Sequence, residues 1–277
     1  MIQGPASLPE LTVLQRARGA GRIAVVADGP TTRLARLYQD GCGKIRLPRD
    51  ASAQGLEAVL INSSGGLTGG DRMAWTAEVG AGAQLTLSTQ ACEKVYRARD
   101  GVAEQRVAVT VGDGARLDWL PQETILFDGG ALSRRLEADL GEGAELLAVE
   151  AVVLGRTAMG ETVRVGALHD RWRIRRAGRL VFADDLRLDG PIAEVTAKAP
   201  MLAGGRAFAS MLLLADDGQR LLAPLRAALG PTGGASAFDG KLFARVVAAD
   251  GFALRQALLP ALEVLRDGRP LPRVWRT

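Results

Sequence analysis

The sequence predicts a mainly β protein, a β-helix-like stack of strands with about two α-helices in the C-terminal part. Three observations support this fold class. A Gly-x-Gly turn opens at Gly80, Gly112 and Gly141, about 30 residues apart, as in stacked repeats. Apolar residues alternate with polar ones on both sides of each turn, and helical spacing of leucines is confined to the end of the chain.

The chain of 277 residues is expected to form a single domain in three parts. Residues 1–60 hold N-terminal strands, residues 61–165 form the glycine-turn repeat region, and residues 166–277 hold further strands and two helices. Strands are predicted over residues 34–46 and 56–62, leading into the first glycine turn.

Each repeat is predicted to be a strand–turn–strand unit. Around the first turn, Trp75, Ala77 and Val79 alternate before the glycines, and Leu85 and Leu87 alternate after them. Paired glycines supply the positive φ of a tight turn. Units in series favour stacked β coils. A meander in which Gly-x-Gly is only a common turn remains the alternative.

Further strands are predicted after the repeats. Residues 171–175 alternate arginine with bulky side chains, which is typical of an amphipathic strand, and residues 180–188 continue it after a turn at Gly178. Residues 207–214 and 243–248 are also predicted strands.

Two helices are predicted near the C-terminus. Residues 219–229 have helical spacing, although Pro224 is expected to break or restart the first turn. Residues 252–265 place leucines on one face, with a possible kink at Pro260. Residues 269–277 are expected to form an irregular tail.

Composition excludes several classes of function. Hydrophobic residues make up 47% and charged residues 24%, and the net charge of +4 is spread among alternating acids and bases, which disfavours nucleic-acid binding. One histidine and two cysteines, Cys42 and Cys92, offer no disulfide framework, zinc motif or Ser-His-Asp set. Residues 1–15 lack the features of a signal peptide and no apolar run has membrane-spanning length, so a cytoplasmic chain without membrane association is expected.

A polar segment follows the second strand of each repeat, at residues 88–97, 120–127 and 149–161. If the coils stack, these segments bring several acids and amides near one another on one side: Gln90, Glu93, Gln122, Glu123 and Glu150. Acids gathered in this way could handle a hard cation or bind a partner, or they could form a solvated face. The pattern alone leaves these possibilities open.

Four sequence blocks, the first before these polar segments and the others within them, resemble the signature of the UreD family of urease accessory proteins. The family is called UreH in some organisms. The blocks are Asn-Ser-Ser-Gly-Gly-Leu-Thr-Gly-Gly-Asp-Arg at 62–72, Thr-Gln-Ala with Lys-Val-Tyr-Arg at 89–97, Trp-Leu-Pro-Gln-Glu-Thr-Ile-Leu-Phe at 119–127, and Leu-Gly-Arg with Ala-Met-Gly-Glu at 154–161. Outside residues 30–190 the likeness is diffuse.

The resemblance implies a scaffold chaperone rather than an enzyme. Such proteins form a complex with UreF and the GTPase UreG, dock on apo-urease and assist nickel delivery, and an internal channel is the proposed route. No cofactor is expected to be permanently bound, and Ni²⁺ would only be in transit. Weak oxygen ligands would release Ni²⁺ quickly, whereas His and Cys ligands would trap it.

The candidate site residues follow from this resemblance and from the repeat. Transient oxygen ligands or focusing charges would come from Asp71, Glu93, Glu123, Glu150 and Glu161, with Gln90 and Gln122 beside them. Four further residues would hold these carboxylates in place or contact a partner protein: Lys94, Tyr96, Arg97 and Arg156. No catalytic residue and no tight metal site is expected. For each acid, a purely structural ion pair is the alternative.

Two other classes of function remain as alternatives. One is a β-solenoid interaction scaffold without a metal role. The other is a β-helical carbohydrate-active enzyme, which is disfavoured because such enzymes want paired acids beside aromatic platforms and aromatic residues make up only 4%.

Overall fold

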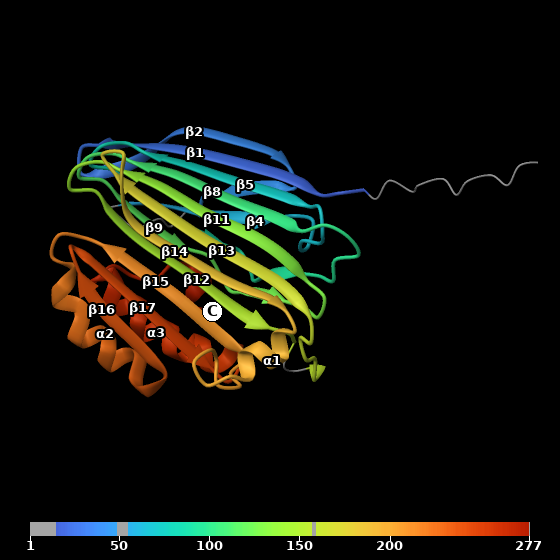
Figure 1. Ribbon diagram of the computed structural model, residues 1–277. Coiled ribbons are helices and arrows are strands. Elements are labelled where there is room, and N and C mark those ends of the chain that lie inside the picture. Colours follow the sequence, from blue (N-terminus) through green and yellow to red (C-terminus); the bar gives the residue numbers. More distant parts are fainter. Residues whose placement is uncertain (1–14, 49–54, 157–158, 277) are drawn as a thin grey trace, which may run out of the picture.

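Two large β-sheets face each other in the computed structural model, which describes residues 15–48, 55–156 and 159–276 (Figure 1). The first, here called sheet A, has the spatial order β14 (Arg179–Gly190), β13 (Gly166–Arg176), β11 (Ala131–Leu140), β8 (Ala103–Val111), β5 (Arg72–Val79), β1 (Arg18–Asp28) and β2 (Thr31–Gly41). The second, sheet B, has the order β16 (Gly233–Phe238), β17 (Lys241–Ala248), β15 (Ala207–Leu214), β12 (Glu145–Leu154), β9 (Arg116–Leu120), β6 (Gln84–Thr89), β4 (Leu56–Asn62) and β3 (Gly43–Arg46). The short strands β7 (Glu93–Val95) and β10 (Thr124–Leu126) pair with each other beside β12.

The repeats form coils, which confirms the β-solenoid and rules out the meander. The chain passes from β5 to β6 and β7, then from β8 to β9 and β10, and then from β11 to β12. Equivalent strands of successive coils are parallel and in register, so that Val79 lies beside Val111 and Val111 beside Leu140. Parallel pairing also joins β1 to β5, β4 to β6 and β13 to β11, which extends the stack beyond the three repeats.

The two glycines of each turn have different roles. The second glycine has a positive φ, 68° at Gly82 and 60° at Gly114, which an L-residue with a side chain adopts only with strain. The first glycine allows neighbouring turns to approach closely. A Cβ atom on Gly112 would lie 2.7 Å from the backbone nitrogen of Ala81. The backbone nitrogen of Gly82 donates to the carbonyl oxygen of Asp113 at 2.9 Å, so the turns are also hydrogen-bonded along the stack.

Substitution of the two glycine types is expected to have different costs. Gly112→Ala forces backbone apart between two coils and should lower the free energy of unfolding by about 2–3 kcal/mol, in the range of overpacked interiors. Gly114→Ala meets open space and should cost only the left-handed conformation, about 1–2 kcal/mol. Urea denaturation of both variants checks this order. An equal or smaller loss for Gly112→Ala would contradict the close approach.

Apolar side chains from the two sheets fill the space between them. The alternating residues predicted around the first turn, such as Trp75, Val79 and Leu85, are buried there together with their equivalents in the next coils. A second apolar cluster lies on the other side of sheet B, where β12, β15 and β17 are covered by helices. Sheet B therefore has two buried faces, and this accounts for the uninterrupted burial along β12 and β15.

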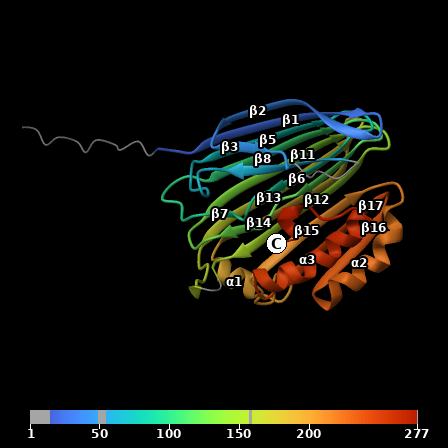
Figure 2. The same ribbon diagram turned by 180° about the vertical axis from the view of Figure 1, so that it is seen from behind.

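Both expected helices are present, with a short additional one. They are α2 (Leu222–Leu229) and α3 (Gly251–Arg266), which lie side by side near β15, β16 and β17, and the additional helix is α1 (Ile192–Ala197) (Figure 2). Asp250 caps α3 by accepting a hydrogen bond from the backbone nitrogen of Ala253 at 2.8 Å. The predicted leucine face, at Leu254, Leu258, Leu262 and Leu265, is buried. The turn before Pro224 is a 3₁₀ helix at Gly218–Leu221, so the expected break is confirmed.

Two sequence expectations were wrong in detail. The strand expected over residues 34–46 is divided into β2 and β3, because Gly41 has a φ of 53° and turns the chain from sheet A into sheet B. The tail expected to be irregular ends in a 3₁₀ helix at Arg273–Trp275, and the Trp275 side chain is fully buried. None of the helices within the described ranges has the length and hydropathy needed to cross a membrane.

Candidate functional site

A row of polar side chains lies inside the solenoid, on the inner face of sheet A. Gln105 in β8, Arg134 in β11 and Asp170 in β13 are direct neighbours in the register of the parallel strands. Each is buried and stands where the alternating pattern of its strand otherwise places apolar residues. The row therefore runs along the direction in which the coils stack.

Arg134 is the centre of a buried ionic cluster. Its Nη2 atom lies 2.6 Å from Oδ2 of Asp170, and its Nη1 atom lies 2.5 Å from Oε2 of Glu150. The same Nη1 donates to Oγ1 of Thr124 at 3.0 Å. The indole of Trp119 donates to Glu150 at 2.8 Å. Two carboxyl groups thus share one guanidinium, so the cluster is negative when both are ionised.

Burial controls the ionisation of this cluster. It raises the pKa of Glu150 to about 7, against the charge of Arg134, and the neighbouring Asp170 raises it further. Burial would lower the pKa of Arg134, but the carboxylates of Asp170 and Glu150 outweigh it and raise that pKa above its usual range. Burial therefore favours the protonated form of Glu150 more than in a solvated carboxyl group.

A cavity of about 160 Å³ adjoins the row at the neighbouring coil, and its lining includes Asn62, Gln90, Glu93, Lys94 and Gln105. The Glu93 carboxylate accepts hydrogen bonds from Nδ2 of Asn62 at 3.1 and 3.3 Å. Burial raises the pKa of Glu93 to about 7, although the bond from Asn62 works in the opposite direction.

Gln122 and Glu123 attach the C-terminal helix to the solenoid. Nη1 of Arg255 in α3 lies 2.8 Å from Oε1 of Gln122 and 3.3 Å from Oε1 of Glu123. The Cys92 thiol donates to Glu123 over 3.5 Å, and burial together with that carboxylate raises the pKa of Cys92 to about 11. The thiol is therefore protonated and unreactive at neutral pH.

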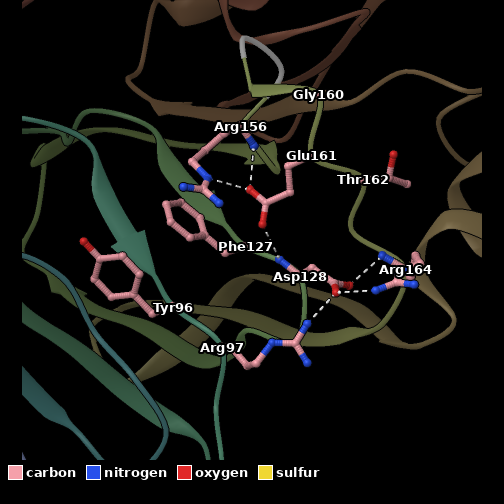
Figure 3. Close-up of a pocket in the computed structure, with 9 residues that line it drawn as sticks. All are labelled: Tyr96, Arg97, Phe127, Asp128, Arg156, Gly160, Glu161, Thr162 and Arg164. Carbon is pink, nitrogen blue, oxygen red and sulfur yellow. Dashed lines mark hydrogen bonds and ion pairs between the residues drawn. The ribbon is translucent and has the colours of Figure 1, made fainter.

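A surface pocket of about 690 Å³ contains four of the predicted residues, Tyr96, Arg97, Arg156 and Glu161 (Figure 3). Arg156 Nε lies 2.8 Å from Oε2 of Glu161, and this hydrogen bond lowers the pKa of that carboxyl. Arg97 reaches Asp128 at 2.6 Å.

Aromatic contacts complete the wall of this pocket. The Arg156 guanidinium lies 4.7 Å from the centre of the Phe127 ring, and the Tyr96 ring meets Phe127 edge-on at 5.0 Å. Because arginines, acids and rings engage one another, the pocket is a pre-organised polar surface.

The eleven predicted residues therefore occupy several separate places. Asp71 is buried and accepts backbone hydrogen bonds from Ala17 and Thr68 at 2.8 Å, so it holds the turn that precedes β5. The expected gathering of acids is only partial. The backbone nitrogen of Glu93 donates to the carbonyl oxygen of Glu123 at 3.0 Å, but their carboxylates and that of Glu150 have different partners.

Within the described ranges, no three His, Cys, Asp or Glu side chains converge closely enough to hold a metal ion. Ala158, in the last of the four sequence blocks, lies outside the described residues. Gln105, Arg134, Asp170 and Arg255 were not among the residues predicted from the sequence. The first three could have been found from the sequence, because each is a polar residue at a position where the alternating pattern of its strand expects an apolar, core-facing one.

The fold and the site define a β-solenoid protein with a polar interior row and a polar surface pocket. The profile of the family described as "UreD urease accessory protein" matches residues 17–276. Urease accessory protein UreD of Agrobacterium fabrum is 55% identical over 94% of this chain and 92% of its own length. Urease accessory protein UreD of Rhizobium leguminosarum bv. viciae is 53% identical over 94% of this chain and 96% of its own length.

The chain belongs to the UreD family of urease accessory proteins. It is therefore an accessory protein with a general role in urease maturation, rather than an enzyme.

Proposed function

We propose that this chain is a maturation scaffold that, with UreF and UreG, docks on apo-urease and assists nickel insertion by conducting Ni²⁺ through the interior of the solenoid. The observation that supports this proposal is the buried polar row. It begins at the cavity beside Glu93 and Gln105, continues at Arg134 and Glu150 in the next coil, and ends at Asp170.

The chemistry of the row suits an ion in transit. Its side chains offer carboxylate, amide and hydroxyl oxygens, which hold Ni²⁺ less tightly than imidazole or thiolate would. Cys92 lines the cavity, but its thiol is protonated. An ion would therefore move between weak ligands without a deep trap.

Arg134 sets a condition on this passage. A buried guanidinium repels a cation, and this repulsion is offset only when the carboxylates around it are ionised. Because the pKa values of Glu93 and Glu150 are raised to about 7, a passing cation displaces protons that these groups hold at lower pH. Passage is accordingly coupled to proton release and is favoured as the pH rises above 7.

The exposed residues of the surface pocket have a different proposed role. Tyr96, Arg97 and Arg156 line a hollow just beyond the C-terminal ends of β7 and β10, and Lys94 is exposed in β7. We assign them to contact with a protein partner, because tyrosine and arginine are enriched among the residues that dominate binding at protein interfaces.

Glu93→Gln and Glu150→Gln test the conduit in cells that express the complete urease operon. Each variant removes a charge but retains the shape of the side chain. Nickel content and activity of the purified urease are expected to fall about tenfold, which corresponds to about 1.4 kcal/mol added to the limiting step. Co-purification of UreF, UreG and apo-urease with the variant should stay at the wild-type level.

Glu78→Gln is the matched control, because Glu78 is exposed on the outer face of β5. It should leave nickel content unchanged. Full nickel content in both interior variants, with the complex assembled, would exclude conduction along this row and favour a scaffold without a metal role.

A further inference from the structure

An arginine-lined hollow, separate from the interior row, lies where α3 ends against the outer face of sheet B. Its volume is about 90 Å³. Arg116 contributes from β9, Arg266 from the last turn of α3 and Arg269 from the segment that follows, and Asp118 is the acid in the lining. Three arginines from three separate parts of the fold thus line one small space.

The acids nearby engage these arginines only in part. Asp118 accepts from Nε of Arg116 at 2.8 Å and from Nη1 of Arg266 at 2.5 Å. Glu145, whose side chain is 36% exposed, accepts from Nη1 of Arg116 at 2.5 Å. Arg269 donates to the carbonyl oxygen of Arg266 at 3.3 Å, a neutral acceptor.

One buried donor of a lining residue has no hydrogen-bond partner. The Nη2 atom of Arg116 is buried and has no hydrogen-bond partner. The Arg116 side chain as a whole is 8% exposed. An unsatisfied group of this kind is uncommon in folded proteins and indicates a missing partner. Burial lowers the pKa of Arg266, the charges of Arg116 and Arg269 lower it further, and the charges of Asp118 and Glu57 act in the opposite direction. Asp118, Glu145 and Glu57 thus offset much of the positive charge, and Arg269 has a neutral hydrogen-bond partner in the lining of the hollow.

We propose that this hollow binds a small oxyanion, which joins β9 to the end of α3. Planar guanidinium groups match phosphate, sulfate and carboxylate oxygens with paired hydrogen bonds. A single water needs about 10–15 Å³, so about 90 Å³ accommodates an anion of a few heavy atoms and excludes a nucleotide. The same chemistry is offered by a free inorganic anion and by a carboxylate side chain of a partner protein.

Thermal unfolding of the purified full chain tests the site, with inorganic phosphate and acetate as separate probes and sodium chloride at matched ionic strength as the reference. Saturating phosphate should raise Tm by about 2–4 °C over the chloride reference, with a hyperbolic dependence on concentration. A shift with phosphate indicates a free inorganic anion, and a shift with acetate alone indicates a carboxylate group.

Arg116→Lys and Arg269→Gln should abolish the shift. Arg116→Lys keeps a charge for Asp118 but removes Nη2, and Arg269→Gln changes a residue that is not fully buried, so the second variant remains informative if the first unfolds. Arg33→Gln, an exposed position in β2, is the control and should respond as the wild type does. Equal Tm values in phosphate, acetate and chloride, or a shift that persists in Arg269→Gln, would overturn the proposal.

Discussion

Arg134→Met is expected to lower the free energy of unfolding by about 3–5 kcal/mol, the range observed when one partner of a buried ion pair is removed. Methionine fills most of the space but leaves Glu150 and Asp170 buried without a counter-charge. Urea denaturation monitored by circular dichroism measures this loss.

The pH dependence of the loss identifies its cause. Without the opposing charge of Arg134, burial should raise the pKa of Glu150 further in the folded protein. An acid with a raised folded pKa favours the folded state at low pH, and this contribution disappears as the pH rises from its unfolded value through its folded value. The difference between variant and wild type should therefore be smaller at pH 5 than at pH 8. A loss independent of pH would attribute the effect to packing instead.

A control variant separates charge from shape. Adding Glu150→Gln and Asp170→Asn to Arg134→Met removes the uncompensated charges and should recover part of the stability. If the triple variant is less stable than Arg134→Met at pH 8, the ionic interpretation of this cluster is wrong.

Trp275→Ala is expected to cost about 3–5 kcal/mol, as for other large buried aromatic side chains. Trp275 is fully buried near the end of the chain, and its indole nitrogen donates to the carbonyl oxygen of Leu120 at 2.9 Å. The Arg255 guanidinium lies 5.0 Å from the centre of its ring. Loss of this anchor should expose the second apolar cluster, and binding of the dye ANS would detect it alongside the urea transition.

Trp275→Phe is the matched control for this second prediction. It keeps an aromatic ring and removes the hydrogen bond to Leu120, so it should cost about 1–3 kcal/mol. A loss below about 1 kcal/mol for Trp275→Ala would show that the tail contributes little to the fold.

The coil architecture could be predicted from sequence because one physical constraint recurs. Gly112 must be glycine to let a neighbouring backbone approach, and Gly114 must be glycine for its positive φ. Because both positions require glycine, the turn appears in the sequence as a repeated Gly-x-Gly motif. The alternation of apolar and polar residues on either side of the motif indicates which side chains face the core. The predicted strand–turn–strand units and the leucine face of α3 were confirmed for this reason.

The interior site was less accessible to sequence reasoning. Arg134 and Asp170 are separated by a whole coil in sequence, and only the register of β11 and β13 makes them neighbours. The burial of Trp275 depends on a contact with Leu120, 155 residues earlier. Long-range pairings of this kind leave no local pattern, so the acids predicted to gather could not be assigned to their separate partners.

Antiparallel hairpins terminate sheet A at both ends. β1 pairs with β2 at one end and β13 pairs with β14 at the other, so the outermost strands run against the direction of the coils. A further coil from a second molecule would have to add in parallel to continue the stack. The reversed edge strands remove that template, and charged residues such as Arg33 and Arg36 on β2 add repulsion. Parallel continuation of sheet A by a second molecule is thereby disfavoured at each end of the stack.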